Sequence, residues 1–245
     1  MKILSYNISW SKQEKIDWLL GQKGIDAYVV PECGNADNIA VPEGYSFFWT
    51  GDFDYKGLGV ICPDNHKIVL PDWYNENLHY AIPVIFDDEY LLLAVWPTVR
   101  KGITSGSYIS ILLDILEYYK PYINKYKTVV IGDYNVISNP NSFQRKESPK
   151  VFAWFEENGL KSAHHTFLHE EIGKESRFTY DHTGKGNCTF FLDYAFTNTE
   201  VKDYKLYSWE ESNRMSDHLP ICVARSSCCT SIYSCCDIEL VDCEV

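Results

Sequence analysis

Short apolar runs rich in β-branched and aromatic residues recur along the chain, and they predict a strand-rich fold. Strands are expected at residues 3–8, 27–30, 45–50, 58–62, 81–86, 90–96, 128–131, 190–197 and 220–224. Apolar residues three or four positions apart predict helices from residue 11 to residue 24, at 107–119 and at 151–158. Ser11 and Glu14 have the spacing of a capping box at the start of the first helix.

The predicted helices lie between groups of strands rather than after every strand. This order disfavours a doubly wound parallel sheet and favours an α/β sandwich of two mainly antiparallel sheets with helices outside. The sequence has no internal repeat and no low-complexity linker before residue 226. We therefore predict one domain at residues 1–225, followed by a cysteine-rich tail at 226–245 with a weak strand pattern at 237–241.

Composition and charge narrow the class of protein. The chain has 245 residues, 45% of them hydrophobic and 15% aromatic, which suits one globular domain with a buried core. A formal net charge of −12 argues against a broad electrostatic grip on long nucleic acids. The charge favours a short or single-stranded substrate, or a small phosphoester.

The N-terminus enters the first strand directly, without a signal-type apolar block. No apolar stretch approaches the ~20 residues that span a bilayer. A cytoplasmic protein without a membrane span is therefore expected, and no feature of the sequence points to a protein partner.

The nine cysteines fall into two groups. Five lie in the tail, at Cys228, Cys229, Cys235, Cys236 and Cys243, and their adjacent pairs do not match the spacing of a zinc knuckle. The others, Cys33, Cys62, Cys188 and Cys222, stand singly beside apolar residues and are predicted to be reduced core residues.

Polar residues with catalytic chemistry end or follow several of the predicted strands, so each would be delivered to the edge of a sheet. They are Asn7, Glu32, Asp133, Asn135, Asp193, Asp217 and His218. Carboxylates, amides and one histidine together suit a divalent-metal site that attacks a phosphate ester.

Glu32 follows an apolar strand and Pro31, a rigid position for a carboxylate. Because Mg²⁺ is bound by few carboxylates together with waters and substrate oxygens, we assign Glu32 as the principal ligand and Asp217 as the second. Asp133 and Asn135 are two positions apart and face the same side. We expect Asp133 to orient or deprotonate the attacking water, and Asn135 to hold that water or a phosphate oxygen.

His218 is expected to donate to a phosphoryl oxygen in its protonated form. Such a histidine needs a carboxylate that fixes its tautomer, and Asp193 is the candidate. Asn7, at the end of the first strand, is expected to bond the substrate phosphate or to position Glu32.

In order and spacing these motifs resemble the endonuclease/exonuclease/phosphatase superfamily, and the resemblance covers residues 1–225. The glycine-rich run at 57–61 also looks like a strand of that family. The resemblance implies a four-layer αββα sandwich with a magnesium-dependent site, in which Mn²⁺ can substitute. It also implies a metal at Glu32 and Asp217, a water oriented by Asp133, and His218 paired to Asp193 at the scissile phosphate, assisted by Asn7 and Asn135.

The chain departs from the family pattern at three positions. Trp96 stands where many members have a phosphate-contacting histidine or tyrosine, so it is either a substrate contact beside Thr98 or a core residue. Indole cannot transfer a proton, which would leave His218 as the acid. Phe191 and Ser9 replace an arginine and an aspartate of repair-type members, which counts against an abasic-site endonuclease.

Substrate choice is expected to lie in the loops. Arg177, Tyr180 and His182 precede the strand of Asp193 and are predicted to grip a phosphate or to stack on a base; an ordinary solvated turn is the alternative. His164 and His165 are expected to be structural or surface residues.

These inferences favour a metal-dependent phosphoesterase that hydrolyses phosphodiester bonds by in-line attack of water. We prefer a nuclease acting on nucleic acid. The alternative is a phosphatase or phosphodiesterase acting on a small phosphoester or a nucleotide. A catalytically silent binding module is disfavoured, because a site without activity has no physical reason to keep a costly cluster of like charges.

Overall fold

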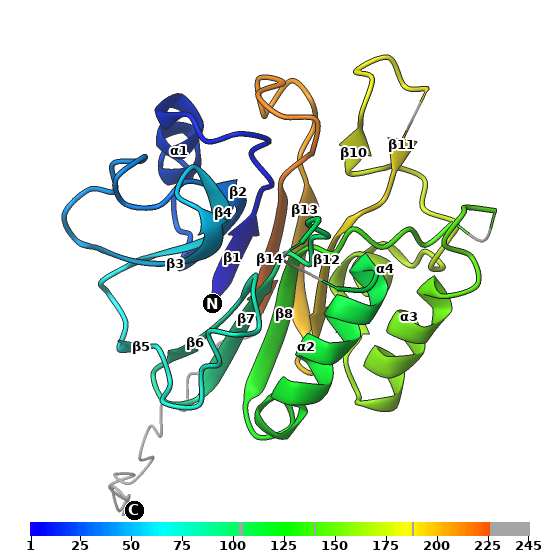
Figure 1. Cartoon of the computed structure of the whole chain (residues 1–245), viewed down its shortest axis with the longest axis horizontal. Coiled ribbons are helices and arrows are strands. Elements are labelled where there is room, and N and C mark those ends of the chain that lie inside the picture. Colours follow the sequence, from blue (N-terminus) through cyan, green and yellow to red (C-terminus); the bar gives the residue numbers. More distant parts are fainter. Residues whose placement is uncertain (103–104, 140, 188, 226–245) are drawn as a thin grey trace, which may run out of the picture.

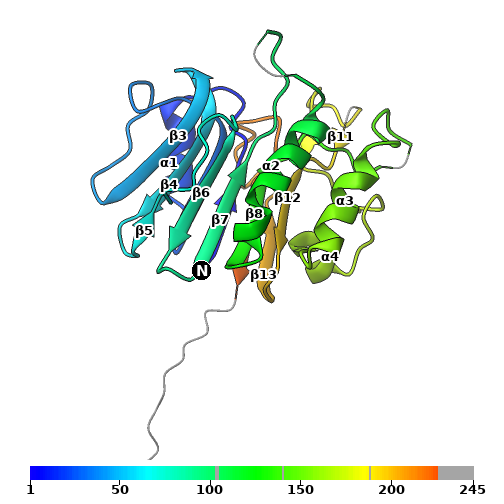
Figure 2. The same ribbon diagram turned by 60° about the horizontal axis from the view of Figure 1, so that its bottom comes forward.

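The computed structural model describes residues 1–102, 105–139, 141–187 and 189–225. Two six-stranded sheets pack face to face, and helices cover their outer faces (Figures 1 and 2). The predicted tail at 226–245, with its strand at 237–241 and its cysteines, lies outside the described residues, as does Cys188.

The first sheet, which we call sheet A, contains strands from both ends of the described chain. Its members are β1 (Lys2–Ser5), β2 (Ala27–Cys33), β3 (Tyr45–Phe53), β4 (Lys56–Pro63), β13 (Val201–Leu206) and β14 (Ile221–Arg225). Their order across the sheet is β13-β14-β1-β2-β4-β3. Only β1 and β2 pair in parallel among these described strands; the other neighbours are antiparallel.

The second sheet, sheet B, has the same mixed pattern. Its members are β5 (Ile68–Val69), β6 (Ala81–Phe86), β7 (Tyr90–Val95), β8 (Lys127–Asp133), β9 (Lys161–Ser162) and β12 (Asp193–Thr197). They lie in the order β5-β6-β7-β8-β12-β9, and β7 and β8 form the parallel pair. The short strands β10 (Tyr180–Asp181) and β11 (Thr189–Phe190) form a separate antiparallel pair.

Helices complete the four layers. α1 (Gln13–Leu20) packs on sheet A, while α2 (Tyr108–Ile123) and α3 (Ser148–Glu157) lie on the outer side of sheet B (Figure 2). The short α4 (Ala163–Leu168) lies at the edge of the sandwich, where it contacts both β12 of sheet B and β13 of sheet A. The predicted sandwich of two mainly antiparallel sheets with helices outside is therefore confirmed.

The alternation of side chains along the strands explains why both faces of sheet A are apolar. Ile3 and Val60 belong to the core between the sheets, while their neighbours Leu4 and Ile61 pack in the cluster under α1 with Ile16. Successive strand residues face opposite sides, so a strand covered on both faces must be apolar at nearly every position. Burial of each such side chain contributes ~1.5–3 kcal/mol relative to exposure.

Several predicted helix boundaries are wrong: α1 ends at Leu20 rather than near residue 24, and α3 begins at Ser148 rather than at 151. α2 continues through Pro121 to Ile123, because Tyr119 and Ile123 are buried and hold the last turn on the core. α1 begins at Gln13 without a side-chain cap, so the predicted capping box at Ser11 is absent. In α2, tertiary packing outweighs the local cost of proline in a helix, which is ~3 kcal/mol.

The predicted strand at 190–197 is divided. β11 ends at Phe190 and β12 begins at Asp193, so Asp193 is the first residue of its strand and pairs with Asp133 at the end of β8. The strand β13 and the helix α4 were not predicted. β13 buries only Tyr204 and Leu206, and α4 has six residues, too short for a periodic pattern to register.

Cys33, Cys62 and Cys222 are free and buried, as predicted. Burial raises the pKa of all three thiols, that of Cys222 to about 11. Buried thiols with a raised pKa are poor nucleophiles, so these residues contribute packing rather than chemistry. No helix in the described part of the chain is long and apolar enough to cross a membrane.

Candidate functional site

The predicted catalytic residues meet at one end of the two sheets, and strand direction explains why. The parallel strands β1 and β2 end at this edge. Asn7 lies just after β1, and Glu32 is the last residue but one of β2. β14 runs antiparallel to β1, so His218, just before it, returns to the same edge. In sheet B, the end of β8 at Asp133 is paired with the start of β12 at Asp193.

The backbone at this edge adopts conformations that side chains rarely permit. Glu32 has φ 64° and sits in a bulge of β2, and Asn135 has φ 53°. At Gly132, with φ 153°, a Cβ atom would lie 1.9 Å from the carbonyl oxygen of Val95. Strained non-glycine residues persist where the surrounding structure fixes them, and they cluster at functional sites.

His218 and Asp193 form the best-defined pair of the site. His218 Nδ1–H donates to Asp193 Oδ2 at 2.8 Å, and both side chains are buried. The hydroxyl of Thr179, which the sequence analysis missed, accepts from the backbone N–H groups of Leu192 and Asp193 and fixes this strand entrance. Asp193 Oδ1 is buried and has no hydrogen-bond partner within the described residues.

Asp133 is held by two asparagine side chains and one backbone amide. Asn7 Nδ2 donates to Asp133 Oδ2 at 2.9 Å, and Asn135 donates from its backbone to Oδ1 at 3.0 Å and from Nδ2 to Oδ2 at 3.3 Å. His218 Nε2 lies 3.9 Å from Asp133 Oδ2. The aspartate therefore presents a fixed carboxylate beside the imidazole.

Burial and neighbouring charges shift the pKa of His218 in opposite directions, and the same is true of Asp133 and the charge of His218. Burial alone would lower the pKa of His218, but the carboxylates of Asp193 and Asp133 raise it to about 10. Burial raises the pKa of Asp133, with Asp193 adding to the effect and His218 opposing it. The two carboxylates therefore favour the cationic form of the imidazole, and Asp133 binds a proton more readily than an exposed aspartate does.

Glu32 extends the same network and carries a partner that the sequence analysis did not name. Asn7 Nδ2 lies 3.5 Å from Glu32 Oε1, so the amide contacts Glu32, one of the roles predicted for it. Lys56 Nζ lies 2.7 Å from Glu32 Oε2. Lys56 stands immediately before the glycine-rich run at 57–61, the one signal that could have drawn attention to it.

A cavity of about 230 Å³ lies over these groups. Its lining includes six of the predicted residues: Glu32, Asp133, Asn135, Tyr180, Asp217 and His218. Asp217 lies beside Ser216, whose hydroxyl donates to the carbonyl of Asn7 at 2.7 Å and accepts from the backbone N–H of His218. Ser216 thus joins the two loops that carry the site.

Of the predicted substrate contacts, Tyr180 lies at the site. Its ring centroid is 4.7 Å from that of His218, and its hydroxyl is hydrogen-bonded to Nδ1 of the exposed His182 at 2.8 Å. Thr98 is half-buried and follows Pro97, whose carbonyl accepts from Asn135 Nδ2. Tyr180 therefore borders the catalytic cavity, while His182 and Thr98 reach the network only through Tyr180 and Pro97.

Two other residues predicted to contact the substrate lie away from the cavity and pack within the protein. Trp96 is 2% exposed and packs edge-to-face against Tyr80 in the core, which is the alternative that the sequence left open. Arg177 donates to the carbonyl oxygens of Leu206 and Tyr207, so its guanidinium secures the end of β13. Arg177 does not line the cavity, and the substrate role predicted for it is not supported.

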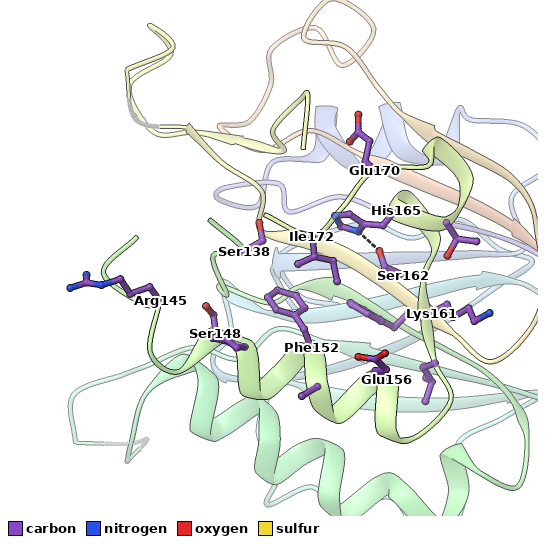
Figure 3. A pocket seen from close by; sticks show the side chains of 15 residues that line it. Ser138, Arg145, Ser148, Phe152, Glu156, Lys161, Ser162, His165, Glu170 and Ile172 are labelled. Carbon is purple, nitrogen blue, oxygen red and sulfur yellow. Dashed lines mark hydrogen bonds between the residues drawn. The ribbon is translucent and has the colours of Figure 1, made fainter. Parts of the chain in front are cut away.

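A larger cavity, about 710 Å³, lies apart from the carboxylate network, between α3 and α4 (Figure 3). The hydroxyl of Ser162 is hydrogen-bonded to His165 Nδ1 at 2.7 Å, and His165 Nε2–H donates to Glu175 at 3.0 Å. His164 bonds Glu170 in the same way. These pairs tie the segment after α4 to the helix, in line with the structural role expected for both histidines.

Comparison with known proteins supports the fold. No family model matches the sequence, and no curated protein matches it. A 3'-5' exonuclease (NExo) from Neisseria meningitidis superposes with a TM-score of 0.69 at 16% identity, covering 93% of this chain and 100% of that one. An AP endonuclease from Archaeoglobus fulgidus gives 0.66 at 16%, with the same coverage.

An endonuclease/exonuclease/phosphatase family protein from Leptotrichia buccalis gives a TM-score of 0.60 at 20% identity, covering 93% of this chain and 100% of that one. The chain therefore has the fold of the endonuclease/exonuclease/phosphatase proteins, the deoxyribonuclease-I-like αββα sandwich, as the sequence motifs predicted.

Proposed function

We propose that residues 1–225 form a divalent-metal-dependent phosphoesterase that hydrolyses phosphodiester bonds, with nucleic acid as the substrate. The observation that carries this proposal is the buried network in which Asn7 links Asp133 and Glu32 beside the His218–Asp193 pair at one cavity. The fold supports it, since the solved structures that share it include a 3'-5' exonuclease, AP endonucleases and a 3' phosphatase bound to a product DNA hairpin.

The residues present fit a hard divalent cation. The donors that border the cavity are carboxylate and amide oxygens, the ligands that Mg²⁺ prefers, and Mn²⁺ accepts the same set. Asp133, Asp193 and His218 bring one ligand atom each to within 4.8 Å of one another, but the imidazole is already engaged with Asp193. Glu32 and Asp217 would therefore hold the metal, which when bound would neutralise charge developing on phosphate oxygens.

The remaining residues supply the proton chemistry and the positioning. Asp133, whose oxygens are aligned by Asn7 and Asn135, can orient the attacking water and accept its proton. Protonated His218, held by Asp193, can donate from Nε2 to a phosphoryl oxygen as negative charge develops there. Lys56 balances the charge of Glu32 at the entrance.

A second candidate substrate is a small phosphoester or a nucleotide. The net charge of −12 favours it, because the 34 acidic residues outnumber the 22 lysines and arginines and would repel a long polyanion. A silent binding module is the least supported function. Burial of Asp133 and Asp193 side by side costs folding free energy, and a protein that only bound a ligand at another surface would have no need of that pair.

The test is cleavage of labelled single- and double-stranded DNA and RNA with Mg²⁺, with Mn²⁺ and with EDTA. We expect shortened products that disappear with EDTA, and a rate lowered by a factor on the order of 10²–10⁴ in His218→Ala. His66→Ala, which removes a histidine from the turn before β5, is the matched control and should keep wild-type activity. Intact polymers in every lane would overturn the nuclease assignment, and a panel of small phosphoesters would then test the second candidate.

The metal ligands can be tested without turnover. Titration calorimetry with Mg²⁺ should show binding by wild-type protein and a clear loss of affinity in Glu32→Gln. Unchanged affinity in that variant would remove Glu32 from the metal site.

A further inference from the structure

The loop after β1 holds Trp10 in a strained and exposed position. Ser9 and Trp10 both have left-handed backbone angles, with φ 42° and 80°, and neither is glycine. The buried Lys15 stabilises this path, since its ammonium group donates to the carbonyl oxygens of Ile8, Ser9 and Trp10. The Trp10 side chain is nevertheless 59% exposed. A strained backbone, held by a buried lysine, therefore keeps the indole exposed to solvent.

Trp10 does not stand alone. Its ring lies nearly parallel to that of Tyr55, at 6.3 Å between centroids and 8° between planes, and the Tyr55 ring lies 5.6 Å from that of Phe53 at 22°. At these separations the rings are laterally offset rather than face to face. Tyr55 and Phe53 lie at the turn between β3 and β4, and they too are exposed, by 49% and 38%. Scattered exposed aromatics are ordinary, but three rings in a row form a contiguous apolar surface. We call these three residues the aromatic platform.

The platform begins beside the catalytic site and is flanked by positive charge. Lys56 Nζ, 2.7 Å from Glu32, lies 4.9 Å from the centroid of the Trp10 ring. At the other end, the guanidinium of Arg100 lies 5.2 Å from the centroid of the Phe53 ring. Ser9 connects the loop to the site directly, because its backbone N–H donates to Asn7 Oδ1 at 2.9 Å.

Unpaired nucleobases are the ligand that these features fit. Every base has an aromatic face that stacks on Trp, Tyr or Phe, whereas the bases inside a duplex present their faces only to each other. Lys56, which is paired with Glu32, and Arg100, which donates to the Tyr80 hydroxyl, place positive charge beside the two outer rings. The net charge of −12 disfavours the broad phosphate contact that a duplex requires.

We infer that Trp10, Tyr55 and Phe53 bind the unpaired bases of a single-stranded polynucleotide whose scissile phosphate lies at the Glu32–His218 site. This inference rests on the proposed phosphodiesterase function and specifies its substrate. The platform selects single strands, or single-stranded extensions, by stacking rather than by reading base edges.

The experiment measures binding by the full chain in EDTA, so that no cleavage occurs. Fluorescence anisotropy compares a labelled single-stranded oligonucleotide with a blunt duplex of the same length. We expect wild type to prefer the single strand, Trp10→Ala to bind it roughly tenfold or more weakly, and Trp10→Phe to retain most of the affinity because a ring is kept. Phe167→Ala removes an exposed ring on α4 and is the matched control, with affinity unchanged.

Equal affinity of Trp10→Ala and wild type for the single strand would overturn the inference, and so would an equal preference for duplex. Hydrolysis of a small chromogenic phosphodiester by the wild-type chain with Mg²⁺ separates this failure from failure of the proposed function. Hydrolysis without single-strand binding would overturn the platform and leave the phosphoesterase. Single-strand binding lost in Trp10→Ala, without any hydrolysis, would support the platform and overturn the proposed chemistry.

Discussion

Two buried histidine–carboxylate pairs in this molecule have nearly the same local geometry and different surroundings. His218 donates to Asp193 at 2.8 Å, and His165 donates to Glu175 at 3.0 Å. All four side chains are less than one-tenth exposed. A histidine–carboxylate pair by itself therefore does not identify an active site.

The second ring nitrogen makes the difference. His165 Nδ1 is taken by the hydroxyl of Ser162, so that imidazole is fully engaged within the protein. His218 Nε2 instead faces Asp133 at 3.9 Å and borders the cavity that Glu32 and Asp217 also line. A second carboxylate raises the pKa of His218 and leaves it charged, with a proton to donate toward the cavity.

The largest expected effect comes from matched amide substitutions in the two pairs. Asp193→Asn should lower turnover of the oligonucleotide by a factor on the order of 10²–10⁴, because His218 loses the carboxylate that orients and charges it. Glu175→Gln should keep the rate within about twofold while costing ~1–3 kcal/mol of stability. Steady-state kinetics and urea unfolding measure the two quantities.

The comparison would break if Glu175→Gln reduced turnover as much as Asp193→Asn did. The second pair would then contribute to catalysis through the segment after α4. Loss of folding in Asp193→Asn, seen by circular dichroism, would instead make that pair structural like the other.

The next effect concerns the strand that carries Asp133. Gly132→Ala should destabilise the fold by more than ~3 kcal/mol, since its Cβ would lie 1.9 Å from the carbonyl oxygen of Val95. Gly159→Ala is the matched control: its φ is 72°, but its Cβ would meet nothing within 4 Å, so only about 1 kcal/mol is expected. Equal unfolding midpoints for the two variants would contradict the close approach of β8 to β7.

The sequence located the residues of the site better than it located their partners. Asp133, Asp193 and His218 could be found because each adjoins an apolar run, and strand ends gather at sheet edges. The pairing of His218 with Asp193 was also expected and is observed. The register that sets Asp193 opposite Asp133 could not be found, because it joins segments 60 residues apart in the chain. The same limit explains Trp96 and Arg177, whose burial and carbonyl partners are fixed only by tertiary packing.

Trp10 and Lys56 were missed for a different reason. The position of Trp10 depends on two left-handed residues in succession, a backbone feature that has no sequence signature. Lys56 stands beside the glycine-rich run, but its contact with Glu32 depends on how the turn between β3 and β4 places it against β2. The sandwich itself was predictable, because alternation and runs of apolar residues determine which faces are buried. Short elements such as α4 and β13 were not, since tertiary contacts rather than periodicity define them.

A smaller effect should follow from releasing the second nitrogen of His165. Ser162→Ala removes the hydroxyl from Nδ1 and leaves a buried acceptor without this partner, at a cost of ~1–2 kcal/mol. Turnover should not change, because neither residue borders the catalytic cavity. Thermal unfolding measures the cost, and a wild-type midpoint would show that solvent from the larger cavity satisfies the imidazole.

The smallest expected effect is a pH dependence of stability that distinguishes His164, beside the His165–Glu175 pair, from His218 at the catalytic site. Burial lowers the pKa of His164, and the hydrogen bond to Glu170 only partly opposes it, so folded His164 stays neutral where an unfolded histidine, with a pKa of about 6.5, binds a proton. As the pH falls below about 6.5, the unfolded state therefore gains a proton that the folded state does not. The contribution of His164 to the free energy of unfolding is complete above that pH and is lost below it, by at most ~1.4 kcal/mol per pH unit. Urea unfolding between pH 7.5 and 5.5 should show a steeper loss for wild type than for His164→Gln. Equal slopes would mean that His164 is protonated in the folded protein, and the two clusters would then resemble each other in charge as well as in geometry.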